Sequence, residues 1–155
     1  MDTESESYDF QFVRSCDYWK VPLKLALAIA RHESGMNPWA VNVSGQSYMF
    51  RTRDEAHRMV DLAWRRGESF DVGIMQVNSY WVRRYGLDPH LLLDPKKNII
   101  FGVWILSKEI ERFGLTWRAV ASYHTPVDEH PERGANYAAA VIHQLTLLNK
   151  GKVTP

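Results

Sequence analysis

Apolar residues recur at helical spacing in most segments of this chain, and capping residues or glycines bound those segments. One helix is expected from Pro22, with apolar positions through Ala30, and Gly35 and Pro38 should end it. Further helices are expected over residues 52–66, 78–84, 95–113 and 116–123, and over a last segment that ends near residue 151. A small hairpin over Val41–Phe50 is the main strand signal. The pattern predicts a mainly α fold, α+β at most through a small β element.

Length and composition indicate one globular domain. A chain of 155 residues with 45% hydrophobic residues and six tryptophans can bury a sizeable core. The formal net charge of +1, without a lysine or arginine stripe, argues against a nucleic-acid partner. Residues 1–9 are polar and are expected to form a flexible leader before a single domain over residues 10–150. No signal peptide or membrane-spanning run is evident, so an exported protein would depend on a signal absent from this sequence.

Glu33 lies in the last turn of the helix that should end before Gly35. The negative end of the helix dipole disfavours a second negative charge at this position. A carboxyl that keeps its proton near neutral pH can act as a general acid. The alternative is an exposed glutamate beside a helix end, and this segment alone leaves both interpretations open.

Two other segments carry polar side chains that suit sugar binding. Gly73 permits close backbone approach, and Gln76 and Asn78 are two residues apart, so both amides would point the same way from an extended segment. Amides can donate to and accept from sugar hydroxyls and N-acetyl groups. Tyr123 ends the helix expected over 116–123, where its hydroxyl would hold the catalytic carboxyl in position. The structural alternatives are a buried turn around Gln76 and a core tyrosine.

Taken together, the motifs resemble the lytic transglycosylases of glycoside hydrolase family 23, relatives of goose-type lysozyme. The resemblance covers roughly residues 12–148 and implies a lysozyme-like fold without cofactor or metal. The chain is most similar to specialised members linked to conjugation, type IV secretion or pilus assembly, because of a helical insertion at 52–66 and the dipeptide at 123–124. The motifs that carry the resemblance are Glu33-Ser34 with Asn37-Pro38, Gly73-Ile74-Met75-Gln76, Ala121-Ser122-Tyr123 and Tyr137.

The resemblance implies that Glu33 protonates the glycosidic oxygen between N-acetylmuramic acid and N-acetylglucosamine. Glu33 would then act as a base while the muramyl 6-hydroxyl closes a 1,6-anhydro ring. The expected partners are peptidoglycan strands and a cell-envelope secretion, conjugation or pilus complex, with the protein a periplasmic or envelope-exported monomer. The residues expected to bind substrate are Ser34, Asn42, Gly73, Ile74, Met75, Gln76, Asn78, Tyr123, His124, Glu132 and Tyr137.

Three features depart from the family pattern. Tyr123-His124-Thr125-Pro126 stands where the family often has Tyr-Asn-Ala-Gly, and Asn42 stands where many members carry a serine. Many small secreted members pair a cysteine near position 16 with one in an Asp-Pro-Cys segment, which here reads Asp94-Pro95-Lys96. Cys16 is therefore expected to be a free thiol packed against the helices.

The insertion at 52–66 is expected at the rim of the cleft and not in the core.

Metal and thiol chemistry have weak support in the sequence. His32-Glu33 could begin a zincin helix motif, but its second histidine would fall at position 36, which is Met36. A metal site built from His124 and His130 has no further support, and the alternative is that both are surface or loop histidines. Cys16 lacks a local signature of a thiol hydrolase.

Two functional alternatives stay open. In a muramidase, a second carboxylate, either Asp71 or Glu132, would activate water for hydrolysis. Asp71 otherwise reads as a turn or capping residue, and Glu132 as a helix N-terminal charge. The second alternative is a non-catalytic peptidoglycan-binding subunit of a secretion or pilus machine, against which the intact Glu33 argues.

Overall fold

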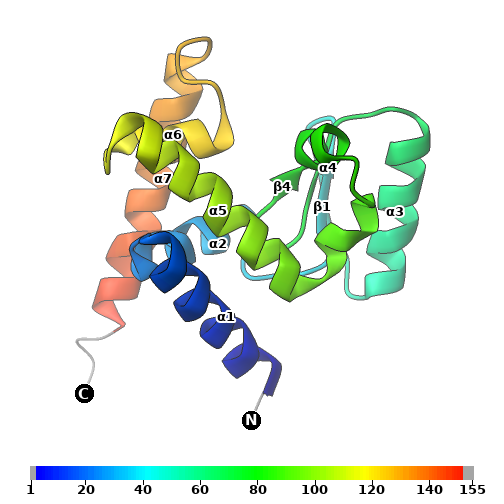
Figure 1. Ribbon diagram of the computed structural model, residues 1–155, viewed down its shortest axis with the longest axis horizontal. Coiled ribbons are helices and arrows are strands. Elements are labelled where there is room, and N and C mark those ends of the chain that lie inside the picture. The colour runs from blue at the N-terminus through cyan, green and yellow to red at the C-terminus, as the bar shows by residue number, and fades with distance from the viewer. Residues whose placement is uncertain (1–2, 152–155) are drawn as a thin grey trace.

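The computed structural model describes residues 3–151, in which seven α-helices accompany a small antiparallel sheet (Figure 1). The helices are α1 (Thr3–Trp19), α2 (Leu23–Ser34), α3 (Arg53–Arg65), α4 (Ser79–Tyr85), α5 (Pro95–Phe113), α6 (Trp117–His124) and α7 (Pro131–Lys150), with a 3-10 turn η1 (Pro89–Leu93). The strands are β1 (Ala40–Val43), β2 (Gln46–Met49), β3 (Phe70–Val72) and β4 (Val77–Asn78). The expected mainly α, lysozyme-like fold is confirmed.

The chain forms two lobes that α5 connects. In Figure 1, α3, α4 and the sheet lie on one side, and α1, α2, α6 and α7 lie on the other. Helix α5 packs against α1 and α6 at one side and against η1 at the other, while α2 packs against α7. None of the helices within residues 3–151 is long and apolar enough to cross a membrane.

Local capping signals begin and end the helices close to where the sequence predicts. The side chain of Thr52 accepts a hydrogen bond from the Glu55 backbone amide at the start of α3, and Asp94 caps α5 in the same way. Gly35 has a φ of 59° and ends α2, because a residue with a side chain rarely adopts this left-handed conformation. Pro22 differs slightly from the expectation: it is the N-cap of α2 and not its first helical residue.

Helix α1 begins within the segment expected to be a flexible leader. Residues 3–9 are helical, and residues 1 and 2 lie outside the described part of the chain. The helix packs along α5, and the Phe12 side chain is fully buried in the core. This tertiary contact supports helical turns before Phe12 that the polar composition did not indicate.

The sheet has the strand order β2-β1-β3-β4, and every neighbouring pair is antiparallel. The expected β1–β2 hairpin is confirmed, whereas β3 and β4 had no strand signal because each is only two or three residues long. Asn42 lies opposite Ser47 on one side and Asp71 on the other, and Asp71 lies opposite Asn78. Residues directly opposite each other share a face of the sheet, so these four form a polar row across one face.

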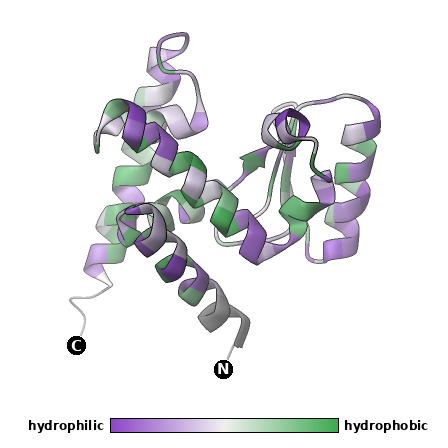
Figure 2. Ribbon diagram, in the orientation of Figure 1, coloured by the Kyte–Doolittle hydropathy of each residue, from purple (hydrophilic) through white to green (hydrophobic). Residues whose placement is uncertain are grey.

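Helix α3 is part of the core, which corrects the expectation that it lies only at a rim. Figure 2 shows that most of α3 is hydrophilic. Its inner residues Ala56, Val60 and Ala63 are nevertheless at most 1% exposed, and the helix packs against η1, β1 and β3. The charged residues on its outer face made the helix resemble a surface insertion.

Cys16 is the buried free thiol that the sequence predicts. Burial raises the pKa of its thiol to about 12, so the nucleophilic thiolate is scarce near neutral pH. We expect iodoacetamide at about pH 8 to label Cys16 slowly in the folded protein and rapidly after unfolding in urea. Mass spectrometry of the labelled protein measures both rates, and rapid labelling of the folded protein would contradict this account.

Candidate active site

Glu33 lies at the point where the helical lobe passes into the sheet. Its position is the last turn of α2, whose inner face is buried against α7, and the chain continues from Gly35 to β1. The Glu33 side chain is 11% exposed. The buried helix therefore holds a largely desolvated carboxyl close to the surface of the sheet lobe.

Two side chains from distant segments converge on one oxygen of this carboxyl. The Tyr137 hydroxyl, from α7, donates a hydrogen bond of 2.8 Å to Glu33 Oε1. The His124 Nδ1 atom, from the end of α6, lies 3.7 Å from the same oxygen. The rings of His124 and Tyr137 are stacked, with centroids 4.6 Å apart and an interplanar angle of 4°. Burial, followed by the nearby charge of Glu33, raises the pKa of Tyr137 well above 10, so its hydroxyl remains a donor.

Tyr123 does not make the expected contact with the carboxyl. Its hydroxyl donates a hydrogen bond of 2.6 Å to the backbone oxygen of Met75. Burial raises its pKa well above 10, and the charges of Glu33 and Asp71 raise it further. Tyr123 thus holds the loop beside Glu33, while Tyr137 contacts Glu33 itself.

The loop Gly73–Gln76 connects β3 to β4 and depends on a residue that the sequence analysis missed. The side chain of Asn98, fully buried on α5, donates to the backbone oxygens of Val72 at 2.7 Å and Leu92 at 2.9 Å. Its Oδ1 accepts a hydrogen bond of 2.9 Å from the Met75 amide. Gly73 has a φ of 85°, and a Cβ atom at this position would overlap the Asn98 amide.

The remaining loop residues face inward. Ile74 and Met75 are fully buried, and the buried Ser34 hydroxyl donates a hydrogen bond of 2.7 Å to the Ile74 backbone oxygen. The Gln76 amide nitrogen donates to the backbone oxygens of Ala40 and Gly73, each at 3.0 Å. These contacts match the structural alternative for Gln76, a turn that its own amide stabilises.

Asn78 belongs to the polar row and not to an amide pair with Gln76, which corrects that expectation. Its Nδ2 donates a hydrogen bond of 2.9 Å to Asp71 Oδ1, and its Oδ1 accepts one from the Tyr80 amide as the cap of α4. Gln76 instead has a φ of 48° and lies outside β4, so the two amides do not project from one extended segment. At the other end of the row, Asn42 donates to Ser47 Oγ at 2.9 Å.

Asp71 is the second acidic group near Glu33. Burial raises the pKa of its carboxyl, the hydrogen bond from Asn78 opposes this shift, and the charge of Glu33 raises the pKa further. The two carboxyls are therefore close enough to interact electrostatically. Glu132, in contrast, is exposed in the first turn of α7, where its charge is favourable to the helix dipole.

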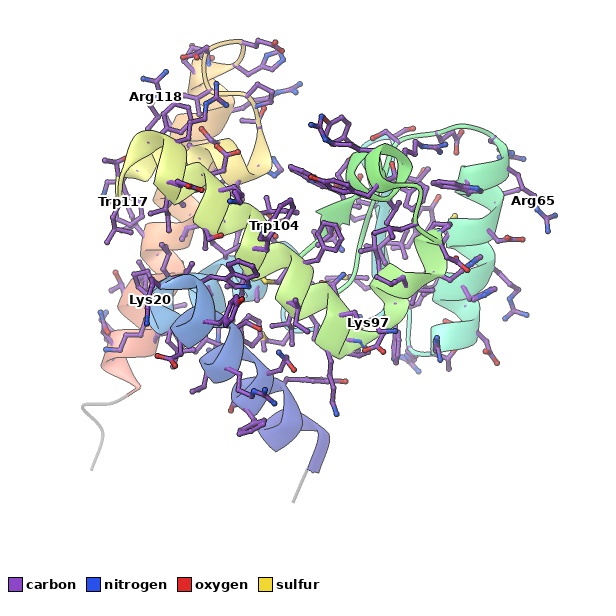
Figure 3. The ribbon with its side chains drawn as sticks, viewed as in Figure 1. Lys20, Arg65, Lys97, Trp104, Trp117 and Arg118 are labelled. Carbon is purple, nitrogen blue, oxygen red and sulfur yellow. The ribbon has the colours of Figure 1, made fainter. Side chains whose placement is uncertain are left out.

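An aromatic cluster joins α4 to α5 on the sheet side. Trp104 projects from α5 toward α4 (Figure 3), where its ring lies 5.4 Å from Trp81 and 6.1 Å from Tyr85. Nearby, a Cβ atom at Gly102 would lie 2.5 Å from the Met75 sulfur, so α5 passes directly against the loop. The cluster and this close approach fix the positions of α4, α5 and the loop relative to one another.

Apart from the exposed Glu132, the structure places the predicted residues in three groups. His124 and Tyr137 contact Glu33 directly, whereas Ser34, Tyr123 and the residues of 73–76 form the loop and its supports. Asn42 and Asn78 belong to the polar row. Within residues 3–151, no three histidine, cysteine, aspartate or glutamate side chains are arranged to hold a metal ion.

Comparison with known proteins gives one family and several relatives. The profile of the transglycosylase SLT domain matches residues 13–145. The invasion protein IagB of Salmonella typhi is 30% identical over 110 residues, which are 68% of this chain and 56% of that protein. The type IV secretion system protein virB1 of Brucella abortus is 37% identical over 81 residues, 51% of this chain and 34% of virB1.

A third relative, the X polypeptide of Escherichia coli, is 32% identical over 87 residues, which are 52% of each chain. The chain therefore spans about half the length, or less, of the curated relatives that it matches. No solved structure matches the chain significantly.

Proposed function

Because the chain belongs to the transglycosylase SLT domain family, we propose that it cleaves the β-1,4 bond between N-acetylmuramic acid and N-acetylglucosamine in peptidoglycan. The product would be 1,6-anhydro-N-acetylmuramic acid, and the enzyme a lytic transglycosylase. The observation that carries the proposal is the largely buried Glu33 carboxyl, held by Tyr137 at the junction of the two lobes.

Glu33 would act first as acid and then as base. Its proton passes to the glycosidic oxygen while the bond from that oxygen to the muramyl anomeric carbon breaks. The resulting carboxylate then takes the proton of the muramyl 6-hydroxyl as the oxygen of this group bonds to the anomeric carbon. Glu33 ends in its starting protonation state, and no water is consumed.

We expect the sugar to bind along the polar row of the sheet. Asn42, Asp71 and Asn78 offer amide and carboxyl groups on one face of the sheet. Asp71 is near enough to Glu33 for the charge of Glu33 to raise the pKa of the Asp71 carboxyl. Polar groups of this kind suit the hydroxyl and N-acetyl groups of a glycan. The loop Gly73–Gln76 would support the sugar-binding face indirectly, because the Gln76 amide nitrogen already donates to the backbone oxygens of Ala40 and Gly73.

The identity of the product tests this proposal. A 6-hydroxyl tethered to the reacting ring can reach an effective concentration of about 10⁵ M, so bulk water competes only if the protein activates it. We expect digestion of purified sacculi to yield muropeptides that end in 1,6-anhydro-N-acetylmuramic acid. Mass spectrometry should find these ends one water lighter than lysozyme products, and free of label when the digestion is made in heavy-oxygen water.

The raised pKa and position of Asp71 favour one alternative, a muramidase. In that enzyme Asp71 would activate a water molecule opposite Glu33, as the second carboxyl of an ordinary glycosidase does. Predominantly labelled reducing ends in heavy-oxygen water would establish hydrolysis. Intact sacculi after prolonged incubation, with the protein bound to them, would instead support a non-catalytic peptidoglycan-binding subunit.

We further propose that the protein works in the cell envelope beside a secretion machine. The support is the similarity to a protein named for invasion and to one named for a type IV secretion system. Peptidoglycan lies in that compartment, and an assembly that crosses it needs a local opening. Fractionation of the source cells, with detection of the protein in the periplasm, tests the location.

A further inference from the structure

We propose that His124 is a positioning residue for Glu33: its imidazolium stabilises the Glu33 carboxylate and, together with Tyr137, assigns proton delivery to Glu33 Oε2. The inference rests on the proposed function, because it concerns the same carboxyl. His124 stands where the resemblance predicts asparagine, so this contact is a departure of this chain from the family pattern.

The geometry brings both partners to the same oxygen atom. Tyr137 donates to Oε1 at 2.8 Å, and His124 Nδ1 approaches Oε1 to 3.7 Å. The two rings are stacked in parallel, with centroids 4.6 Å apart. His32 packs edge-on against the same tyrosine, with ring centroids 5.2 Å apart. The position of His124 is therefore set by packing as well as by charge.

This arrangement distinguishes the two oxygens of Glu33. A hydroxyl with a raised pKa offers its only proton to Oε1, so Oε1 acts as an acceptor. No hydrogen bond or ion pair to Oε2 is formed within the described part of the chain. When Glu33 is protonated, its proton is therefore on Oε2, which is the atom left to meet the glycosidic oxygen.

The charges around His124 favour its protonated form. The interaction with Glu33 raises the pKa of His124 above 6.5, and the charge of Asp71 raises it further. Burial and the charge of Arg133 on α7 oppose the shift. Tyr123 and Tyr137, the other titratable groups beside it, stay neutral because their pKa values are raised.

The imidazolium acts at the moment when Glu33 becomes negative. Before transfer the Glu33 carboxyl is neutral, and after transfer it carries the charge that a cation 3.7 Å away stabilises. His124 keeps its own proton throughout, and Glu33 regains one from the 6-hydroxyl. Because the His124 side chain is 49% exposed, solvent screens the effect, and we expect a moderate rate change of about tenfold.

The rate increase that the His124 imidazolium provides should fall as pH rises. At low pH the His124 imidazole is protonated, and its charge favours the transition state over the neutral carboxyl that donates the proton. As pH rises through the raised pKa of His124, the imidazolium loses its proton. The rate advantage that His124 provides is therefore present at low pH and is lost as pH rises.

The test compares wild type with His124→Phe, which keeps a ring for stacking but removes the charge. We expect the ratio of their kcat values on solubilised glycan strands to be about ten near pH 5 and to fall toward one near pH 8. KM should change less than kcat, because the charge acts on the reacting carboxyl. The matched control is His143→Phe, which replaces an exposed histidine of α7. The ratio of the wild-type kcat to the kcat of this variant should stay near one at every pH.

A second measurement does not depend on activity. NMR titration of the His124 imidazole should give a pKa above the ordinary value in wild type and a lower one in Glu33→Gln, because the interaction with Glu33 is the main cause of the shift. A kcat ratio that is the same at every pH, or an unchanged imidazole titration in Glu33→Gln, would overturn the inference. Either result with an active wild type leaves the proposed function intact, whereas a wild type that never cleaves glycan rejects the function itself.

Discussion

Replacing Glu33 by glutamine is expected to lower the rate of peptidoglycan cleavage by about 10²–10⁴-fold, the usual contribution of general acid–base catalysis. Glutamine keeps the size of the side chain, and its amide oxygen can accept the hydrogen bond that Tyr137 donates to Oε1. It has no proton to give to the leaving oxygen and cannot act as a base afterwards. The loss should appear in kcat, measured as release of soluble muropeptides from purified sacculi.

The substitution should leave the fold intact, because it removes a charge and not a packing contact. Thermal unfolding and circular dichroism check that Glu33→Gln is folded. The matched control is Glu111→Gln, which removes an exposed carboxylate on α5 that pairs with Lys108, and we expect wild-type activity from it. A well-folded Glu33→Gln variant with the wild-type rate would mean that another group supplies the proton.

Replacing Asn98 by leucine is expected to lower the free energy of unfolding by about 3–5 kcal/mol. The side chain bonds to the backbone groups of Val72, Leu92 and Met75, all of which it holds in the core. Leucine has a similar volume but leaves these groups without partners, and each buried unpaired group costs about 1–3 kcal/mol. Urea unfolding should show a lower midpoint at an unchanged slope.

The Asn98 substitution should also reduce activity in the molecules that remain folded, because the loop Gly73–Gln76 loses its anchor on α5. Asn136→Leu is the control: Asn136 is exposed on α7, and its replacement should change stability by less than about 0.5 kcal/mol. An Asn98→Leu variant as stable as wild type would show that the loop holds its conformation without this side chain.

The sequence by itself determined where most helices begin and end. Caps such as Thr52 and Asp94, and the left-handed Gly35, act on backbone groups within one turn, so a reader of the sequence can recognise them. The same local logic located Glu33 at the end of α2. The order of the motifs along the chain was enough to indicate the family that the profile match shows.

The tertiary structure alone decided which side chains meet. Glu33 and Tyr137 are 104 residues apart in sequence, and no periodicity distinguishes Tyr137 from Tyr123 as the partner of the carboxyl. Asn98 did leave a signal, a polar residue four positions before Gly102 on an otherwise apolar face of α5. Its three partners, however, come from the end of β3, from the loop and from η1.

The short strands and the role of α3 required the assembled fold for a related reason. The two-residue strand β4 is stable because it pairs with β3, which in turn pairs with β1. Helix α3 has a mostly hydrophilic surface, and only contact with η1 and the sheet buries Val60. Capping is a local interaction and can be read from neighbouring residues, whereas burial and pairing depend on segments that meet only after the chain has folded.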